Sequence, residues 1–329
     1  MASIRDVANR AGVSIATVSY VLNGSRSVSE ALAERVQNAA AELGYRPNRS
    51  ARALRSGRSH ALALIVPDLA NPFFHGIARA VVLVARSLGY LALLFDSEDD
   101  PESDCENLSY LSSYGVDGAI WAPVPNGLQC ALTTPTVTID RRPTTMREID
   151  LIATDHMLGG RLVAEHAIAL GHRHVGLLSG PSASEPARLR RQGFLEAAAE
   201  RCTIAWDLEV PVIADADFPG EAREALLSGE ASFVFAATDW AAAGAMRTLR
   251  TAGIAIPEQV SVCGYDGTMP FNLLSPSLST VRQPVEDISR RAVELLLERI
   301  KNPAMPIQDV ILPVSLLARE STAAAPNQS

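Results

Sequence analysis

Lysine is almost missing from this 329-residue chain, in which Lys301 is the one lysine among 29 basic residues. The chain also lacks a G-x-S-x-G motif, a glycine-rich phosphate loop followed by lysine, and a G-x-G-x-x-G fingerprint. Those motifs supply an acyl-transfer nucleophile, a nucleotide-phosphate site and a dinucleotide site, respectively. We therefore expect neither enzyme activity nor a cofactor.

Cysteine is scarce as well, and no C-x-x-C pair occurs. The four cysteines are scattered along the chain: Cys105, Cys130, Cys202 and Cys263. Four histidines in one region lack the spacing of metal ligands: His156, His166, His172 and His174. These patterns predict no metal site and no disulfide framework, with the thiols reduced and buried.

Long apolar runs are absent too. No stretch approaches the ~18 uninterrupted apolar residues of a membrane span, and residues 1–30 have no apolar segment typical of a secretory signal. We therefore expect a cytoplasmic protein without a membrane partner. The length suits two or three domains.

The charge of the chain is unevenly distributed. Its formal net charge is −8, yet residues 1–59 hold nine arginines and four acids, a net charge of +5, which leaves −13 for the rest. A basic N-terminal arm on an acidic body is expected where one part binds phosphate. The alternative is a chance cluster on a solvated surface.

Residues 1–46 have the pattern of three short helices. Ser3 fits the N-cap of the first helix, Gly12 the sharp turn after it, and Ser14 the N-cap of the second. Ser29 opens the third. This layout predicts a helix-turn-helix, and the alternative is a helical hairpin within a larger core.

The second helix has a face that its apolar stripe does not use. Ile15, Ala16, Ser19 and Tyr20 project from this face, and they are small or polar groups of the kind that reach base edges. This leftover face favours the helix-turn-helix over the plain hairpin.

Residues 47–59 form a second basic element. Pro47 can begin a helix that runs from Asn48 to Leu54 and is rich in arginine and alanine. So short a helix is marginal alone, and a linker is the simpler interpretation. The alternative is a hinge helix that forms only with DNA and a second copy, where Leu54 acts as an apolar wedge in the minor groove.

From residue 60 the sequence alternates between buried strands and helices. The predicted strands lie in 61–67, 90–96, 115–123, 134–140, 174–180, 232–239 and 260–266. This alternation predicts two doubly wound α/β lobes with a ligand cleft between the carboxyl ends of their sheets. The predicted lobes are 60–157 with 285–312, and 158–284 with 313–329.

Polar and aromatic side chains collect at these strand ends. They are Asp68, Asn71, Phe73 and Phe74 after the first strand, Asp140 and Arg141 after the fourth, and Arg190, Phe218, Thr238, Asp239 and Asp266 in the second half. Carboxylates, arginine planes and rings suit a polyhydroxylated ligand. The alternative role for any one of them is a salt bridge or a helix cap.

Three further interpretations concern the cleft. Phe73 and Phe218 could instead sandwich a flat nucleobase. Asp155 is expected to cap the helix that follows it rather than touch ligand. Trp240 either closes the cleft or packs.

Several segments together resemble one known family. They are DVA, AGVS, TVS, VLN, LGYRPN and ARAL near the N-terminus, and VPDLANPFF, GVDGAI, TIDRRP, ALGHRHVGLLSGP, RLRRQGF, VSVCGYDG and LARESTAA in the body. The sequence is similar to the lactose/galactose/purine (LacI/GalR) repressors, a family of bacterial transcription regulators. The resemblance covers nearly the whole chain.

The resemblance implies a set of DNA-contacting residues: Ser14, Ile15, Ala16, Thr17, Ser19, Tyr20, Asn23, Ser29, Asn48, Arg49, Arg52, Leu54 and Arg55. It places Ile15 and Ala16 in the major groove, where they largely select the operator half-site. Tyr20 departs from the arginine or histidine more often found there, because tyrosine offers one hydroxyl and a ring instead of donors for guanine.

The resemblance also implies how the protein works. It predicts a homodimeric regulator, most simply a repressor, that binds a near-palindromic operator with a central CG-type step on the bacterial nucleoid. A sugar-like effector in the cleft would control it, with Arg190 and Asp266 as the strongest contacts. A nucleoside-responsive regulator and a solute-binding transport protein are the alternatives. No leucine heptad follows the end of the body, so a dimer rather than a tetramer is expected.

Overall fold

The computed structural model describes residues 2–23, 28–45, 58–127, 129–211, 218 and 220–326. The chain divides into two compact units, residues 1–60 and 61–329. The predicted hinge contacts Asn48, Arg49, Arg52, Leu54 and Arg55 lie outside the described residues, as does the side chain of Asn23. Within the described part, no helix is both long and apolar enough to cross a membrane.

The first unit contains the three predicted helices, α1 (Ile4–Ala11), α2 (Ile15–Asn23) and α3 (Glu30–Glu42). Small apolar side chains from all three form its core, around the fully buried Val7, Val18 and Val36. Because alanine and valine fill this core, the helices approach closely although each is short.

The predicted caps of this unit are confirmed for α1 and α2. The Ser3 hydroxyl accepts from the Asp6 N–H while Asp6 accepts in return, which is a reciprocal capping box. Gly12 has φ +64°, a conformation that favours glycine. The Ser14 hydroxyl accepts from the Thr17 N–H at 3.1 Å. Ser29 is at the N-cap of α3 as predicted, but it makes no side-chain capping bond.

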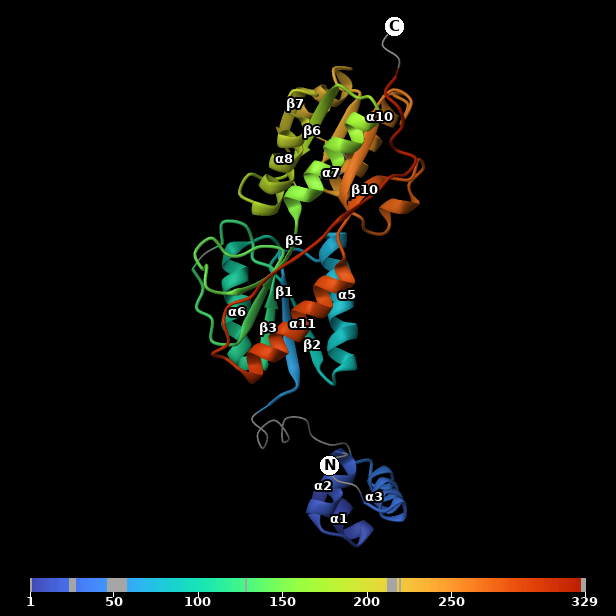
Figure 1. Ribbon diagram of the computed structural model, residues 1–329. Coiled ribbons are helices and arrows are strands. Elements are labelled where there is room, and N and C mark those ends of the chain that lie inside the picture. The colour runs from blue at the N-terminus through green and yellow to red at the C-terminus, as the bar shows by residue number, and fades with distance from the viewer. Residues whose placement is uncertain are drawn as a thin grey trace. The chain divides into compact units, whose positions relative to one another are not determined.

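The second unit begins with a lobe built on a six-stranded parallel sheet of order β11-β5-β4-β3-β1-β2. Its strands are β1 (Ala61–Val66), β2 (Leu91–Asp96), β3 (Gly118–Trp121), β4 (Thr136–Ile139), β5 (Asp150–Thr154) and β11 (Asp309–Leu312). Its helices are α5 (Pro72–Ser87), α6 (Pro101–Tyr114) and α11 (Val285–Lys301). We call this the N-lobe; α5 and α11 cover one face of the sheet and α6 the other (Figure 1).

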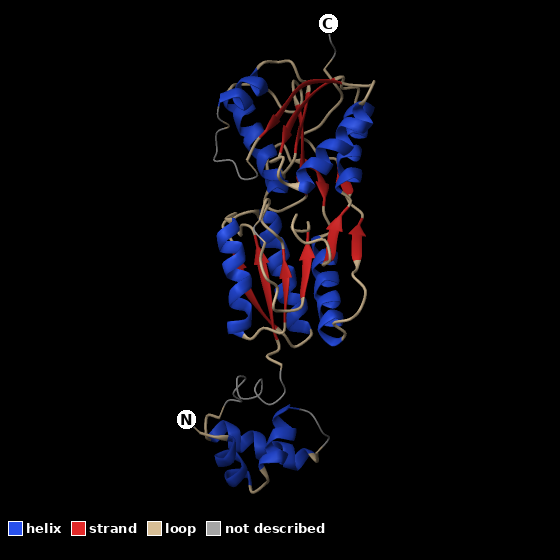
Figure 2. Cartoon of the chain, turned by 90° about the vertical axis from the view of Figure 1, so that its left-hand side faces the viewer, coloured by secondary structure: helices blue, strands red, loops and turns tan. Residues whose placement is uncertain are grey.

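The other lobe, the C-lobe, has a six-stranded sheet of order β12-β10-β9-β8-β6-β7, in which β12 runs antiparallel to β10. Its strands are β6 (His174–Ser179), β7 (Thr203–Glu209), β8 (Phe233–Ala236), β9 (Ser261–Asp266), β10 (Ser279–Arg282) and β12 (Ser315–Leu317). Its helices are α7 (His156–Ala169), α8 (Glu185–Ala198), α9 (Gly220–Leu227), α10 (Asp239–Thr251) and the short 3₁₀ helix η1 (Phe271–Leu273). Figure 2 shows helices on both sides of the strands in each lobe.

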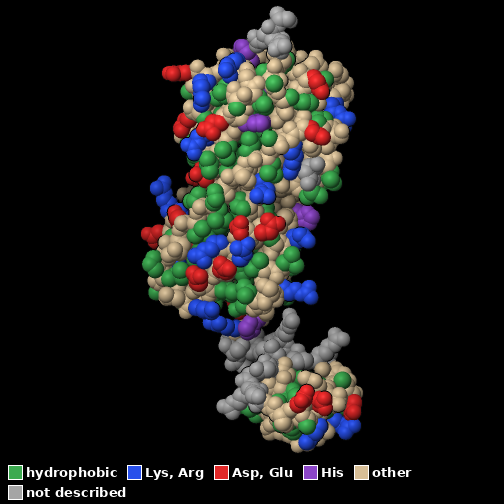
Figure 3. Space-filling view, turned by 45° about the vertical axis from the view of Figure 1, so that its right-hand side comes forward, with side chains coloured by type: hydrophobic (Ala, Val, Ile, Leu, Met, Phe, Trp, Pro, Cys, Tyr) green, Lys and Arg blue, Asp and Glu red, His purple; other side chains and the backbone are tan. Residues whose placement is uncertain are grey.

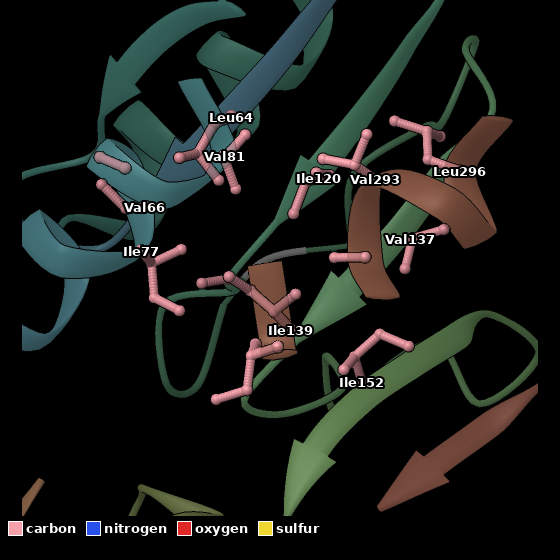
Figure 4. Packing of buried hydrophobic residues seen from close by; sticks show 14 of the residues in the cluster. Leu64, Val66, Ile77, Val81, Ile120, Val137, Ile139, Ile152, Val293 and Leu296 are labelled. Atoms are coloured by element: carbon pink, nitrogen blue, oxygen red, sulfur yellow. The ribbon is translucent and has the colours of Figure 1, made fainter. Parts of the chain in front are cut away.

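The N-lobe core lies between its sheet and the helices α5 and α11. Ile77 and Val81 of α5 and Val293 and Leu296 of α11 pack on inward-facing strand residues such as Ile120 (Figure 4). All six residues of β1 are buried, as its continuous apolar run predicts for a central strand of a parallel sheet.

The chain passes between the lobes three times, at Asp155, at 283–284 and at 313–314. Asp155 caps α7 as predicted, because its carboxylate accepts from the Leu158 N–H at 2.8 Å. The three passages matter for function, since any change in the angle between the lobes must be absorbed there.

The expectation that all cysteines are reduced is wrong for two of them. Cys105 of α6 and Cys130 form a disulfide, with their Cα atoms 5.3 Å apart, while Cys202 and Cys263 are free. The segment that follows β3 packs beside α6 and so brings together two residues 25 positions apart. Sequence spacing alone does not reveal such a pairing.

Candidate functional site

A cavity of about 360 Å³ lies between the carboxyl ends of the two sheets and is lined from both lobes. This is the position at which open α/β sheets bind ligands. Nine of the eleven residues predicted from the sequence line it: Asp68, Asn71, Phe73, Phe74, Asp140, Arg141, Arg190, Thr238 and Asp266.

The other two predicted residues do not line the cavity. Phe218 is buried in the apolar core between β8 and α10, with its ring against Gly244. Asp239 is turned away, because its carboxylate accepts from the Thr268 N–H at 2.8 Å and from the Thr280 hydroxyl. Burial raises the pKa of Asp239 to about 6, against the lowering effect of these bonds. Asp239 therefore links α10 to the neighbouring strand and loop.

On the N-lobe side, Asp140 and Arg141 form an acid–arginine pair at the end of β4. The Arg141 Nε and Nη2 donate to the same Asp140 oxygen at 3.0 and 2.7 Å. Burial opposes ionisation of Asp140, but the positive charges of Arg141 and, less strongly, Arg190 outweigh it and hold its pKa below the ordinary value. Asp140 is therefore a charged acceptor.

On the C-lobe side, Arg190 of α8 is fixed from several directions. Its Nη1 donates to the Ala237 carbonyl oxygen at 2.6 Å, and its Nε donates to His156 Nδ1 at 3.3 Å. The guanidinium carbon lies 3.8 Å from the centre of the Tyr265 ring. Nη1 is also 3.4 Å from the Asp266 carboxylate. A guanidinium has five N–H groups, so donors remain for a ligand.

Asp266 ends β9 with φ +116°, an unusual backbone conformation for a residue with a side chain. Burial raises its pKa to about 7, although Arg190 acts in the opposite direction. Near neutral pH its carboxyl group is therefore available both as an acceptor and as a donor for ligand hydroxyls.

Gln283, which sequence reasoning missed, positions Asp266. Its side-chain amide donates to Asp266 at 2.9 Å, and its oxygen accepts from the Thr154 hydroxyl at 2.7 Å. Gln283 and Thr154 lie at two of the passages between the lobes, so this chain of bonds joins the cavity to them. The sequence feature that could have indicated Gln283 is a polar residue directly before a proline, between a strand and a helix.

His156, at the start of α7, is the second residue that was missed as part of the site. Its Nδ1 accepts from Arg190, so the proton of the neutral ring is on Nε2, which points at Asp140 from 3.6 Å. Burial, strengthened by Arg190, lowers its pKa to about 3 and outweighs the attraction of Asp140. A neutral imidazole thus lies between the acid of one lobe and the arginine of the other.

The pKa of His156 predicts a pH dependence of stability. Between pH 6.5 and about 3 the unfolded chain binds a proton at this histidine and the folded chain does not, so the free energy of unfolding falls as the pH falls. From pH 7 to pH 5 this loss is about 2 kcal/mol. His156→Gln should lose that much less than the wild type in urea unfolding at the two pH values, and equal losses would contradict the assignment.

Phe73 and Phe74, in the first turn of α5, form the aromatic wall of the cavity. Their rings pack edge to face with centroids 5.1 Å apart. Asn71 caps this helix by accepting from the Phe73 N–H at 3.0 Å, which fixes where the rings begin. The cavity therefore combines an apolar wall with one acid–arginine pair from each lobe.

In the first unit, the predicted DNA-contacting residues that are described lie at the surface of α2 and its flanks. Ser14, Ile15, Ala16 and Ser29 are exposed, and Ile15 has 40% of its surface accessible. The other three, Thr17, Ser19 and Tyr20, are partly exposed, whereas Val18 is fully buried in the core. Among the described residues, this face of α2 is therefore at least partly accessible.

A helix-turn-helix unit joined to a two-lobed body with a ligand cavity defines a class: DNA-binding regulators that respond to small molecules. The family model of the bacterial regulatory proteins of the lacI family matches residues 3–48, and that of the periplasmic binding protein-like domain matches residues 164–322. The chain belongs to the lacI family of transcription regulators and is not an enzyme.

Three similar proteins show how far the similarity extends. The ribose operon repressor of Halalkalibacterium halodurans is 35% identical, with 99% of each chain covered. The lac repressor dimer bound to operator and the anti-inducer ONPF has a TM-score of 0.84 at 30% identity, covering 98% of this chain and 99% of that one. A lacI-family regulator from Enterococcus faecium with bound ribose has a TM-score of 0.69 at 28% identity, covering 80% and 99%.

Proposed function

We propose that this protein is a repressor of a sugar operon whose effector is a monosaccharide, with ribose as the first candidate. The observation that carries the proposal is the cavity of about 360 Å³ with one acid–arginine pair from each lobe. The relatives support it, since one is named a ribose operon repressor and another holds ribose.

The chemistry of the cavity suits a sugar ring. Adjacent sugar hydroxyls each donate one hydrogen bond and accept others, so a carboxylate beside a guanidinium satisfies both roles. Asp140 and Arg141 form such a pair of acceptor and donor on one side of the cavity, and Asp266 and Arg190 form the other pair on the opposite side. Phe73 and Phe74 can cover the apolar C–H face of the ring. A flat nucleobase fits less well, because Phe218 is not there to form the second plane.

Effector binding is coupled to DNA through the lobes. A ligand that bonds to Asp140 and Asp266 at once favours one angle between the lobes, and it shifts the population toward that state by its difference in affinity for the two. In the dimer this angle sets the spacing of the two segments 47–59 that lead to the helix-turn-helix units.

On the DNA side, we propose that Ile15 and Ala16 of each copy lie in the major groove of one half-site, with an apolar contact to a thymine methyl group. The segment with Asn48, Arg49, Arg52 and Arg55 binds along the central minor groove, where Leu54 opens a CG-type step. Such binding takes place in the cytoplasm, where the operator is, and weakens strongly with salt because phosphate contacts release counterions.

A thermal-shift series on the full-length chain tests the effector. D-ribose, other pentoses, hexoses, sucrose and adenosine are added in turn, and the true effector raises the unfolding midpoint by mass action. A shift with ribose or another monosaccharide supports the proposal. A shift with adenosine alone, or with none of the sugars, contradicts it.

We also propose a homodimer that uses an apolar face of the N-lobe. Large apolar side chains of α5, of its C-cap and of the edge strand β2 are exposed there: Val82 36%, Leu83 51%, Leu88 48%, Leu91 49% and Leu94 45%. Figure 3, which turns the side with α5 forward, shows hydrophobic side chains at the surface among charged ones. An exposed edge strand that carries leucines tends to pair with another chain, which indicates that a partner covers it.

Leu83→Asp tests this dimer. Leu83 lines a groove together with Met269 of the C-lobe, so this groove spans both lobes. A carboxylate placed in such an interface should weaken dimerisation at least tenfold, about 1.4 kcal/mol or more. Sedimentation equilibrium measures the change, with Tyr110→Asp on α6 as the exposed control. An unchanged dimer in Leu83→Asp would place the interface elsewhere.

A further inference from the structure

The disulfide between Cys105 and Cys130 joins α6 to the segment that follows β3, and it is partly open to solvent. Both half-cystines are partly exposed. The free Cys263, in contrast, is fully buried. Small thiols can therefore reach the disulfide without unfolding of the lobe, and thiol–disulfide exchange depends on such access.

The turn of α6 that contains Cys105 also holds the edge of the cavity. Asp104, adjacent to Cys105, is 1% exposed, and its carboxylate accepts from the Trp121 ring N–H at 3.0 Å and from the Val124 N–H at 3.2 Å. Val124 and Pro125 line the cavity. Cys130 follows a few residues later in the same segment. The segment that forms this edge is thus tied to α6 at two points, by hydrogen bonds to Asp104 and by the disulfide.

We propose that Cys105 and Cys130 form a reversible redox site that tunes the affinity of the protein for its effector. The disulfide form pre-organises Val124 and Pro125 at the cavity edge, and the dithiol form releases the segment and weakens effector binding. Pre-organisation acts in this way because a segment fixed before binding loses less conformational freedom on binding. The inference rests on the proposed function of the cavity as the effector site.

The chemistry is thiol–disulfide exchange with a low-molecular-weight thiol of the glutathione class. The thiolate of the small molecule attacks one protein sulfur, the S–S bond breaks, and the other cysteine leaves as a thiolate that takes up a proton. A second small thiol attacks the mixed disulfide and frees the remaining cysteine. Two electrons pass to the protein, and the two small thiols become one disulfide. Oxidation by that disulfide is the reverse.

The cytoplasmic environment favours a reversible disulfide over a permanent structural one. An operator-binding protein works in the cytoplasm, where thiols are kept reduced and disulfides in mesophiles are usually transient, catalytic or redox-sensing. The accessibility of Cys105 and Cys130 fits a pair that is formed and broken there.

The first experiment counts thiols on the full-length chain. The protein is equilibrated in a series of glutathione redox buffers, alkylated and analysed by mass spectrometry. We expect Cys105 and Cys130 to convert together between the two forms within the cytoplasmic range of glutathione ratios, while Cys202 and Cys263 stay reduced. A pair that remains reduced in the most oxidising buffer, or oxidised throughout that range, overturns the proposal.

The second experiment compares effector affinity in the two forms by calorimetry with D-ribose, or with the sugar that the thermal-shift series identifies. The reduced chain should bind about threefold to tenfold more weakly than the oxidised chain. Cys130→Ser should bind like the reduced chain in either buffer, and Cys202→Ser should respond like the wild type. Equal affinities of oxidised and reduced wild type, within twofold, would overturn the proposal.

Hydrogen exchange separates a failure of this inference from a failure of the proposed function. Amides of the cavity edge, including the Val124 N–H, should exchange faster in the reduced chain whether or not any sugar binds. Faster exchange with no sugar binding in either form would refute the effector assignment and keep the redox effect on the edge. Unchanged exchange would refute the redox effect itself.

Discussion

Replacing Asp266 by Asn is expected to weaken effector binding about 30-fold, or about 2 kcal/mol, because a hydrogen bond to a charged group is worth roughly that much. The substitution keeps the shape of the side chain, and its oxygen can still accept from Gln283. What is lost is a carboxylate that accepts from a ligand hydroxyl beside the guanidinium of Arg190. Operator affinity without effector should stay within about threefold.

Asp239→Asn is the matched control. Asp239 is a second buried aspartate of the C-lobe with a raised pKa, but its carboxylate is taken up by Thr268 and Thr280 and does not line the cavity. Calorimetry on both variants decides the question. If Asp239→Asn loses as much affinity as Asp266→Asn, the cavity geometry described above does not define the binding site.

Gly160→Ala is expected to lower the free energy of unfolding by about 3 kcal/mol, the upper part of the usual range for overpacking. A Cβ at Gly160 would overlap the carbonyl oxygen of Arg190 and lie 2.7 Å from the Phe194 nitrogen. Both are backbone atoms of α8, so relief requires the whole helix to move away from α7. Because α8 carries Arg190, effector affinity should fall together with stability.

Urea unfolding measures this effect, and Gly76→Ala serves as its control. Gly76 lies within α5, and a Cβ there would meet only the Val285 side chain, at 3.5 Å, an ordinary contact. Alanine is the better helix former, so Gly76→Ala should be neutral or slightly stabilising. Similar free energies of unfolding for Gly160→Ala and the wild type would mean that α7 and α8 do not pack as closely as described.

Much of the fold could be predicted from local sequence. The capping serines, the turn at Gly12 and the buried run of β1 each follow from chemistry within a few residues. Polar residues at the ends of parallel strands must meet at one edge of the sheet, so nine of the residues that line the cavity could also be predicted. Arg190 was predicted as a contact, yet its fixed orientation depends on Tyr265 and Ala237, which lie far along the chain.

The remainder depends on contacts between distant segments. The strands β5, β7, β10, β11 and β12 were not predicted, and β7 and β11 are edge strands whose half-exposed residues lack a continuous apolar run. Phe218 was assigned to the cavity as one of the rings expected at the strand ends, but an apolar ring is more stable in the core beside Gly244. The role of Gln283 could be recognised only from its hydrogen bonds with Thr154 and Asp266, which lie far from each other in the sequence.

The central claim is that a small molecule in the cavity controls the affinity of the protein for operator DNA. The most direct test is to measure operator affinity with and without effector. A duplex selected by the protein from a random library is labelled, and its dissociation constant is measured by anisotropy at fixed salt. We expect the selected duplex to have inverted symmetry, and its dissociation constant to change at least tenfold when the effector saturates the cavity, about 1.4 kcal/mol of coupling. An effector that binds by calorimetry yet leaves this constant unchanged would contradict the account.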